Sequence, residues 1–182
     1  MLKRTVLVLI TLLYPLAVYF GLQSFEARHL VLVLILVAGI RVASLGQSPL
    51  NHWFWLPLLA LLGLWTWLLN SPLALKLYPI LVSASFLILF AWSLKNPPPM
   101  IERIARLQEP DLPERGVHYT RQVTKVWCCF FALNGSVALA VTLYGSDADW
   151  ALYNGLISYL CMGALFAGEW LVRQRVMKGA YD

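Results

Sequence analysis

The chain has 182 residues, of which 60% belong to the hydrophobic set AVILMFWYC and only 13% are charged. A soluble domain carries about 45 to 50% apolar residues even with glycine counted, and a disordered chain is polar and highly charged, so both classes are excluded. Three cysteines, Cys128, Cys129 and Cys161, lie inside apolar runs without the spacing of a disulfide framework or a metal site. The composition therefore predicts an all-α, polytopic membrane protein.

Six apolar runs approach the length that crosses the hydrocarbon core as a helix, about 20 residues. The second run is the shortest and contains Arg41. In chain order the predicted spans are Thr5 to Leu22, Leu30 to Leu45, Trp53 to Leu69, Leu77 to Leu94, Lys125 to Tyr144 and Trp150 to Leu171.

The distribution of basic residues predicts that both termini face the cytoplasm, because lysine and arginine near span ends are retained on that side. With this orientation twelve basic residues are cytoplasmic, and only Arg28 and Lys76 are outside. The net charge of +5 thus reflects topology, and no nucleic-acid partner is expected. Tryptophan favours the headgroup level, and all eight tryptophans fall in or near the first or last turns of predicted spans.

The spans divide the chain into four N-terminal helices at 1–94, a cytoplasmic loop at 95–124, and a C-terminal hairpin with a basic tail at 125–182. In the loop, Pro97 to Pro99 end the fourth span, because proline cannot donate the next helical hydrogen bond.

A short amphipathic helix is predicted after these prolines. At 100° per residue its apolar arc comprises Met100, Ile101, Ile104, Ala105 and Leu107, opposite an arc of Glu102, Arg103, Arg106 and Glu109. The helix either lies on the inner leaflet or packs on the cytoplasmic face of the bundle. In the first case basic residues contact the leaflet, namely Arg103, Arg106, Arg173 and Arg175.

Polar residues in the last two spans indicate the faces that pack against other helices. The face predicted in the fifth span is Thr124, Trp127, Phe131, Asn134, Ala138 and Thr142, and in the sixth span it is Asn154, Ser158, Cys161 and Glu169. Small residues spaced four apart predict a tight pair of these two helices through Ala132, Ser136 and Ala140 on one side and Gly163, Ala164, Ala167 and Gly168 on the other. Asn134 and Asn154 are interpreted mainly as interhelical hydrogen-bonding groups.

Glu169 is the single acid inside a predicted span, which makes it a candidate functional residue. One interpretation is a local ion pair with Arg173, four residues on. The other pairs Glu169 with Arg41 or Arg121 of another helix and creates a polar pocket at the inner leaflet. Arg41 alone is interpreted as a side chain that extends to the interface.

No catalytic motif, cofactor motif or metal-ligand set is found in the sequence, and no catalytic residue, cofactor or metal is predicted. His118, beside Tyr119 and Arg121, is the best remaining candidate for proton exchange. It lacks a paired carboxylate, so a loop histidine at the headgroup level is the favoured interpretation.

One set of positions in the C-terminal half carries a family resemblance: Lys95, Asn96, Pro97, Met100, Ile101, Glu102, Arg103, Arg121, Trp127, Phe130, Phe131, Asn134, Trp150, Gly155, Phe166 and Leu171. Near the start, Tyr14, Pro15, Leu16, Tyr19 and Phe20 also fit. The chain resembles the intracellular septation protein A family of bacterial inner-membrane proteins. It is still more similar to membrane proteins encoded with fatty-acid-like biosynthesis genes of the aryl-polyene type. The proline-rich loop and Glu169 depart from the septation pattern.

The resemblance implies a protein of the bacterial inner membrane linked to envelope building, with no catalytic residues to carry over. The residues and the resemblance together leave three functions open. The first is a non-enzymatic scaffold or accessory factor that binds membrane lipids and envelope, division or biosynthesis proteins. The second is a carrier of a lipid or aryl-polyene-like acyl product, and the third, suggested by the residues alone, is a membrane enzyme that uses His118. The candidate residues for a ligand or partner are Glu169, Arg41, Arg121, His118, Tyr119, Asn134, Asn154 and Trp127.

Overall fold

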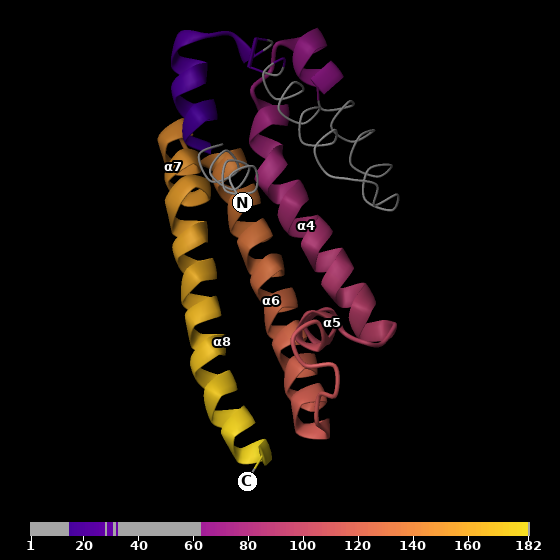
Figure 1. The fold of residues 1–182 in the computed structure, drawn as a ribbon. Coiled ribbons are helices and arrows are strands. Elements are labelled where there is room, and N and C mark those ends of the chain that lie inside the picture. The colour runs from indigo at the N-terminus through magenta and orange to yellow at the C-terminus, as the bar shows by residue number, and fades with distance from the viewer. Residues whose placement is uncertain (1–14, 28, 31, 33–62, 182) are drawn as a thin grey trace. The chain divides into compact units, whose positions relative to one another are not determined.

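The computed structural model describes residues 15–27, 29–30, 32 and 63–181, and this part of the chain contains helices but no strand (Figure 1). Residues 15–24 and 63–69 are helical. The later elements are α4 (Leu73–Lys95), α5 (Met100–Arg106), α6 (Glu114–Tyr144), α7 (Asp147–Leu152), the π-helical turn η1 (Tyr153–Ile157) and α8 (Ser158–Tyr181).

Among the described residues, three helical segments are long and apolar enough to cross a membrane, which agrees with the predicted all-α membrane class. They are Leu75–Lys95, Glu114–Tyr144 and Asp147–Gln174. The predicted spans from Thr5 to Leu22, Leu30 to Leu45 and Trp53 to Leu69 lie wholly or partly outside the described residues. The number of six spans and the N-in, C-in orientation therefore stay predictions.

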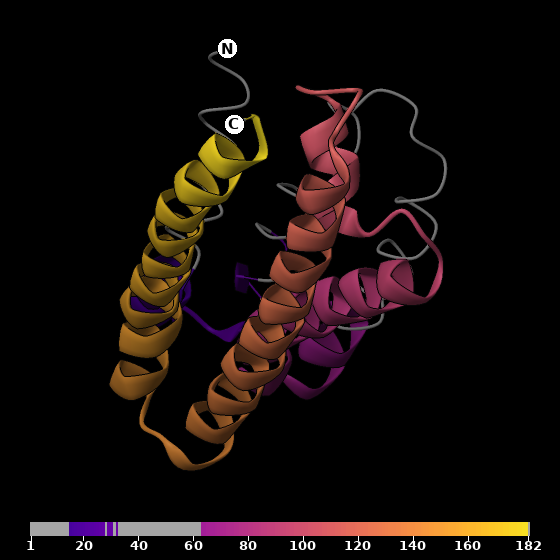
Figure 2. The same cartoon turned by 90° about the horizontal axis from the view of Figure 1, so that it is seen from below.

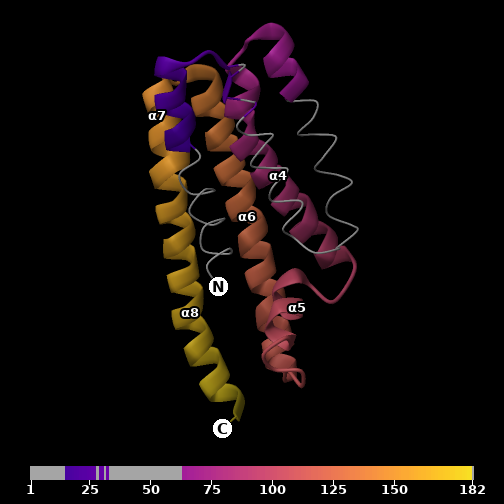
Figure 3. The same ribbon diagram turned by 45° about the horizontal axis from the view of Figure 1, so that its top comes forward.

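The chain divides into two compact units. The first comprises the described residues of Met1–Tyr78 together with Val141–Gly155, and the second comprises Pro79–Ala140 and Leu156–Asp182. In the second unit α6 lies between α4 and α8 and runs antiparallel to both, and α5 lies beside the N-terminal part of α6 (Figures 1, 2 and 3). The basic ends of these three long helices therefore lie at the same end of the unit.

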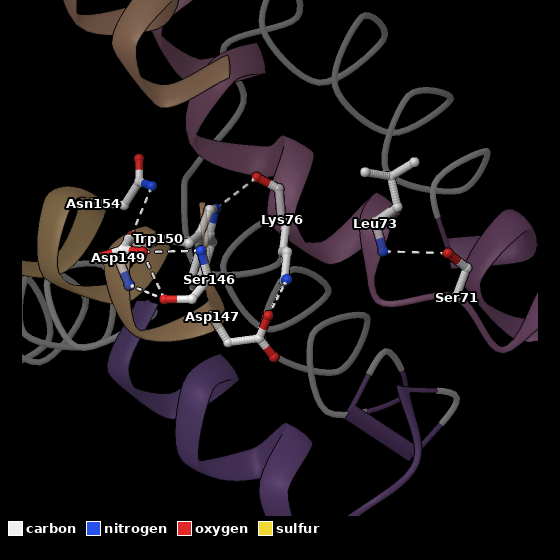
Figure 4. Close-up of polar contacts among 8 residues, drawn as sticks. All are labelled: Ser71, Leu73, Lys76, Ser146, Asp147, Asp149, Trp150 and Asn154. Carbon is white, nitrogen blue, oxygen red and sulfur yellow. Dashed lines mark hydrogen bonds and ion pairs between the residues drawn. The ribbon is translucent and has the colours of Figure 1, made fainter. Parts of the chain in front are cut away.

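The core of the first unit is built around Trp150. This side chain is 1% exposed and packs with Val18, Ala27, Leu75 and Ala151. Its indole Nε1 donates to the Lys76 carbonyl oxygen at 3.1 Å, so the polar edge of the ring is satisfied inside the core (Figure 4).

The chain turns between α6 and α7 at a capping box. Ser146 Oγ accepts from the Asp149 amide at 3.2 Å, and the Asp149 carboxylate accepts from the Ser146 amide at 3.0 Å (Figure 4). Two orphan amides at the start of α7 are thereby satisfied. Lys76 also forms an ion pair with Asp147. The helix thus begins three residues before the predicted start of the sixth span at Trp150.

The core of the second unit is a cluster of aromatic rings. Phe131 of α6 stands at its centre, with ring centroids 5.2 Å from Phe86 and 5.2 Å from Phe90 of α4. Trp127, one turn earlier on α6, has its ring centroid 4.5 Å from that of Phe166 on α8. Aromatic pairs at these distances stabilise beyond the area they bury, so the rings join the three long helices.

The predicted face of the fifth span is confirmed as the inner face of α6. Five of its six residues are buried and Asn134 is partly buried. The face predicted for the sixth span is correct at Asn154 and Ser158, which are 3% and 7% exposed, but wrong at Cys161, which is exposed. Met162 and Leu165 pack against the aromatic core instead. The residue of α8 that follows Ser158 on the inner face is Met162, four positions on, and Cys161 therefore lies beside this face rather than on it.

The predicted contact of α6 and α8 through small residues is wrong. Ala132, Ser136, Ala140, Ala164 and Ala167 are exposed. A Cβ atom built at Gly163 or Gly168 would meet no atom within 4 Å. The large rings of Trp127 and Phe166 occupy the contact, and side chains of this size hold the two helix axes too far apart for a small-residue interface.

Two tryptophans are packed in the cores of the two units. Trp127 and Trp150 are 4% and 1% exposed, whereas Trp92 and Trp170 are more than half exposed. Trp127 was expected in the first turn of a span that starts at Lys125, but α6 already starts at Glu114. The segment 114–124, which is part of the predicted loop 95–124, is therefore helical.

Candidate functional site

The short helix α5 is attached to both neighbouring long helices by hydroxyl groups. Its first amides have no acceptor within the helix, as at any helix N-terminus. The Met100 amide donates to Ser93 Oγ of α4 at 2.9 Å, and the Ile101 amide donates to Thr124 Oγ1 of α6 at 3.4 Å. The predicted amphipathic helix is thus present, and it packs on the helices α4 and α6.

The polar arc predicted for α5 is partly wrong, because Glu102 is buried at 5% exposure and Leu107, from the apolar arc, is 84% exposed. The Arg106 guanidinium makes the burial of Glu102 possible. Arg106 Nε donates to Glu102 Oε1 at 2.8 Å, and Arg106 Nη1 donates to the Pro110 carbonyl at 2.9 Å. A buried carboxylate is tolerated when it is paired and hydrogen-bonded in this way.

Arg103 closes the turn between α4 and α5. Its guanidinium donates to the Pro98 carbonyl at 2.7 Å and to the Asn96 carbonyl at 3.1 Å. The predicted leaflet contacts of Arg103 and Arg106 stay predictions, and both guanidinium groups also hold this turn together. Arg175 lies in α8, and its side chain is outside the described part of the structure.

Glu169 contacts Tyr119, an interaction that neither interpretation of the sequence predicted. The Tyr119 hydroxyl donates to the Glu169 carbonyl oxygen at 3.0 Å and lies 3.4 Å from Glu169 Oε1. Among the described residues, no ion pair within 4 Å joins Glu169 to Arg173 or to Arg121, so both of these predicted pairings are wrong. The pairing with Arg41 lies outside the described residues.

A pocket of about 210 Å³, here called the Tyr119 pocket, surrounds this contact. It lies in the second unit among α5, the segment that follows it, α6 and α8. It is lined by Ile101, Ile104, Ala105, Gln108, Leu112, Gly116, Tyr119, Thr120, Trp127, Phe166, Glu169 and Arg173. Tyr119, Trp127, Glu169 and Arg173, each a candidate from the sequence, are thereby brought together.

The Tyr119 pocket combines an apolar wall with a small polar group. Trp127, Phe166 and Leu112 form part of the wall, and the Glu169 carboxylate and the Arg173 guanidinium belong to the same lining. A carboxylate accepts hydrogen bonds and a guanidinium donates them. The arrangement therefore suits a molecule that has an apolar body and one polar end.

A second pocket, here called the Arg121 pocket, has a volume of about 450 Å³. Its lining residues are Pro97, Pro98, Pro99, Glu102, Arg106, Val117 and Arg121. Arg121 therefore lines a different pocket from Glu169, although both come from the basic end of the same helical unit.

Of the other candidates, the described ones line neither pocket. Asn134 Nδ2 donates to Ser83 Oγ of α4 at 3.1 Å, which confirms its interhelical role. Asn154 Nδ2 donates to the Trp150 carbonyl of its own helix at 2.9 Å. His118 is exposed on α6, and its Nε2 atom lies 3.4 Å from Gln122 Nε2. In the described ranges no three His, Cys, Asp or Glu side chains gather as a metal site would require.

Sequence reasoning missed several residues that shape the Tyr119 pocket, above all Leu112 and Gly116. A Cβ atom at Gly116 would lie 2.8 Å from Leu112 Cγ, so the absent side chain lets Leu112 pack on α6. An isolated glycine early in a helix was the available signal, because glycine there often has a packing reason.

In the ranges that the structure describes, the fold is all-helical and contains three helices suited to crossing a membrane. Comparison of the chain with protein-family models, with curated proteins and with solved structures finds no match.

Proposed function

We propose that this chain is a non-enzymatic protein of the bacterial inner membrane that binds a lipid-like molecule in the Tyr119 pocket. It acts as an accessory factor or carrier in the biogenesis of the envelope or of a lipid-like product. The supporting observation is the pocket itself, in which Glu169, Arg173 and the Tyr119 hydroxyl adjoin an apolar wall. The resemblance of the sequence to septation-type and aryl-polyene-associated membrane proteins points to the same pathways.

The size of the Tyr119 pocket limits which part of a ligand it can enclose. Its volume of about 210 Å³ is below the range of about 300 to 1,000 Å³ that encloses a whole small molecule. Only part of a lipid would fit, with the remainder of its chain in the bilayer. Exposed apolar side chains next to the pocket, Ile104 on α5 and Phe166 on α8, favour such a partly enclosed chain.

The basic ends of the helices support a position at the inner leaflet. Lys95 ends α4, Arg115 and Arg121 lie near the start of α6, and Arg173 lies in the C-terminal half of α8. Positive residues near span ends are retained in the cytoplasm. A ligand in the Tyr119 pocket would then enter from the cytoplasmic leaflet, where newly made acyl products and lipids are available.

Filling the Tyr119 pocket should abolish lipid binding at this site. Ile104 is half exposed and lines the pocket, so Ile104→Trp would place an indole at its entrance without disturbing the core. We expect native mass spectrometry in mild detergent to show a co-purified lipid-like molecule on the wild type that is lost from Ile104→Trp.

Leu107→Trp is the matched control, because Leu107 is 84% exposed on the same segment and does not line the pocket. It should retain the lipid. A wild type that carries no lipid but holds a stable protein partner would favour the scaffold function instead. Equal lipid occupancy in both variants would show that the pocket is not the binding site.

Replacing Glu169 tests the polar end of the pocket. Glu169→Gln keeps the shape and an acceptor oxygen but removes the charge, so a ligand that donates to this carboxylate should bind about tenfold more weakly, as expected for a charge-assisted hydrogen bond. The measurement is a lipid titration followed by native mass spectrometry. Glu114→Gln, at an exposed acid of α6 outside the pocket, should bind like the wild type. An unchanged affinity in Glu169→Gln would contradict a role of this carboxylate in binding.

A further inference from the structure

The Arg121 pocket lies on the other side of the contact between α5 and α6 from the Tyr119 pocket. On α5, Glu102 and Arg106 line it, whereas Ile101, Ile104 and Ala105 line the Tyr119 pocket. On α6, Val117 and Arg121 line it. Its volume of about 450 Å³ lies within the range of about 300 to 1,000 Å³ found for small-molecule sites.

The charged groups of this pocket leave a surplus of one positive charge. Two guanidinium groups, of Arg106 and Arg121, adjoin one carboxylate, of Glu102. Glu102 is bound by Arg106 at 2.8 Å, so this pair is internally neutral. Within the described part of the chain no carboxylate lies within ion-pairing distance of Arg121, and its side chain is exposed. The guanidinium of Arg121 is therefore available to an external anion.

The prolines in the lining of the pocket restrict how an anion could be held. Pro97, Pro98 and Pro99 have no amide hydrogen and so donate no hydrogen bond. The Pro98 carbonyl is already used by Arg103 at 2.7 Å. An anion in this pocket would be bound by guanidinium groups, and its apolar part would contact the proline rings and Val117 of the same lining.

We infer that the Arg121 pocket binds a phosphate ester. The planar guanidinium offers two parallel donors to phosphate oxygens, and the surplus positive charge of the pocket attracts an anion. The proline rings and Val117 suit the carbon atoms next to the ester. The same chemistry is offered by the headgroup of an anionic phospholipid and by a soluble phosphate ester. This site is separate from the Tyr119 pocket and does not depend on the function proposed for it.

The test measures binding of two phosphate esters to the full chain in mild detergent. Dioleoyl phosphatidylglycerol represents the lipid source, and sn-glycerol 3-phosphate represents the soluble source. Zwitterionic phosphatidylcholine is the lipid reference. Two variants address the pocket in different ways: Arg121→Gln removes the donor, and Val117→Phe fills the space without changing the charge.

The control is Lys125→Gln, which removes an exposed positive charge one turn further along α6, outside the pocket. We expect phosphatidylglycerol to bind the wild type and Lys125→Gln alike. It should bind about tenfold more weakly to Arg121→Gln, the loss expected for charge-assisted hydrogen bonds to one guanidinium. Val117→Phe should weaken it by a similar factor.

The two phosphate esters distinguish the possible sources of the ligand. If glycerol 3-phosphate binds with the same dependence on Arg121 and Val117, the site takes a phosphate ester from the soluble side as well. If only phosphatidylglycerol shows that dependence, the headgroup of a lipid is the ligand. Equal losses in Lys125→Gln and Arg121→Gln would reveal unspecific charge attraction, and unchanged binding in both pocket variants would equally overturn the inference.

Discussion

Replacing Trp127 by alanine is expected to destabilise the protein more than any other single truncation in the second unit. The side chain is 4% exposed and its ring contacts Phe130, Phe131 and Phe166, with the closest centroid distance, 4.5 Å, to Phe166. Truncation would leave a cavity where α6 meets α8. In soluble cores Trp→Ala changes cost about 3 to 5 kcal/mol. Loss of the ring contacts should destabilise the protein in a membrane as well, because van der Waals packing drives the association of helices in lipid.

The free energy of unfolding should be followed by denaturant titration in mild detergent, with α-helical circular dichroism as the signal. Trp92→Ala and Trp170→Ala are the matched controls, because both rings are more than half exposed. Surface substitutions usually stay within about 0.5 kcal/mol. Similar losses in all three variants would refute the assignment of Trp127 to the core.

A reporter enzyme that is active only outside the cytoplasm should be strongly active when fused at Gly145 and inactive when fused at Leu107. Gly145 stands between α6 and α7, and Leu107 follows α5, so the two sites lie at opposite ends of α6. Residues 145–149 contain no lysine or arginine and two aspartates, whereas residues 95–125 contain Lys95, Arg103, Arg106, Arg115, Arg121 and Lys125. This asymmetry favours retention of the second segment in the cytoplasm.

A reporter that is active only inside the cytoplasm, fused at the same two sites, should give the reverse pattern. Immunoblots of all four fusions control for the amount of protein. Activity of the first reporter at Leu107 but not at Gly145 would invert the orientation of α6, and the proposed entry of the ligand from the cytoplasmic leaflet would have to be abandoned.

The Tyr119 pocket and the Arg121 pocket have a common architectural cause. The proline run ends α4, and the next helix, α5, is then attached to α4 and α6 through Ser93 and Thr124. A short helix held across two long ones leaves space on each of its sides. One space is bounded by α8 and aromatic rings, and the other is bounded by prolines and arginines. The chemical difference between the two pockets follows from these boundaries.

The sequence alone predicted those features that arise within one helix. The membrane class follows from apolar runs, since an uninterrupted helix is needed to satisfy the backbone in lipid. The inner face of α6 follows from the 3.6-residue period, which places Thr124, Trp127, Phe131 and Ala138 on one stripe. The helical structure of residues 100–106 follows from the proline run and the amphipathic pattern after it.

Predictions about two different helices were less successful, because a residue pattern along one helix contains no information on the helix that faces it. Small residues in α6 and α8 suggested a close contact, yet aromatic rings occupy the interface, and Gly163 and Gly168 of α8 have no neighbouring side chain within 4 Å of a Cβ position. Trp127 and Trp150 were assigned from the sequence to span ends, a pattern that did not indicate that both pack in a core. Glu102 suggested a polar surface, yet Arg106 and the fold of the loop allow its burial.

The interaction of Glu169 with Tyr119 also shows the difference between features of one helix and contacts between two helices. Its position in an apolar helix marks it as unusual from the sequence, because a carboxylate there is costly and requires polar neighbours. The spacing of four residues to Arg173 suggested a local ion pair. The tertiary structure instead places the Tyr119 hydroxyl at the Glu169 carbonyl, fifty positions away in the chain. Local periodicity decides which side of a helix is buried, whereas the side chains that meet across helices depend on ring sizes, helix ends and loop attachments that act only once the chain has folded.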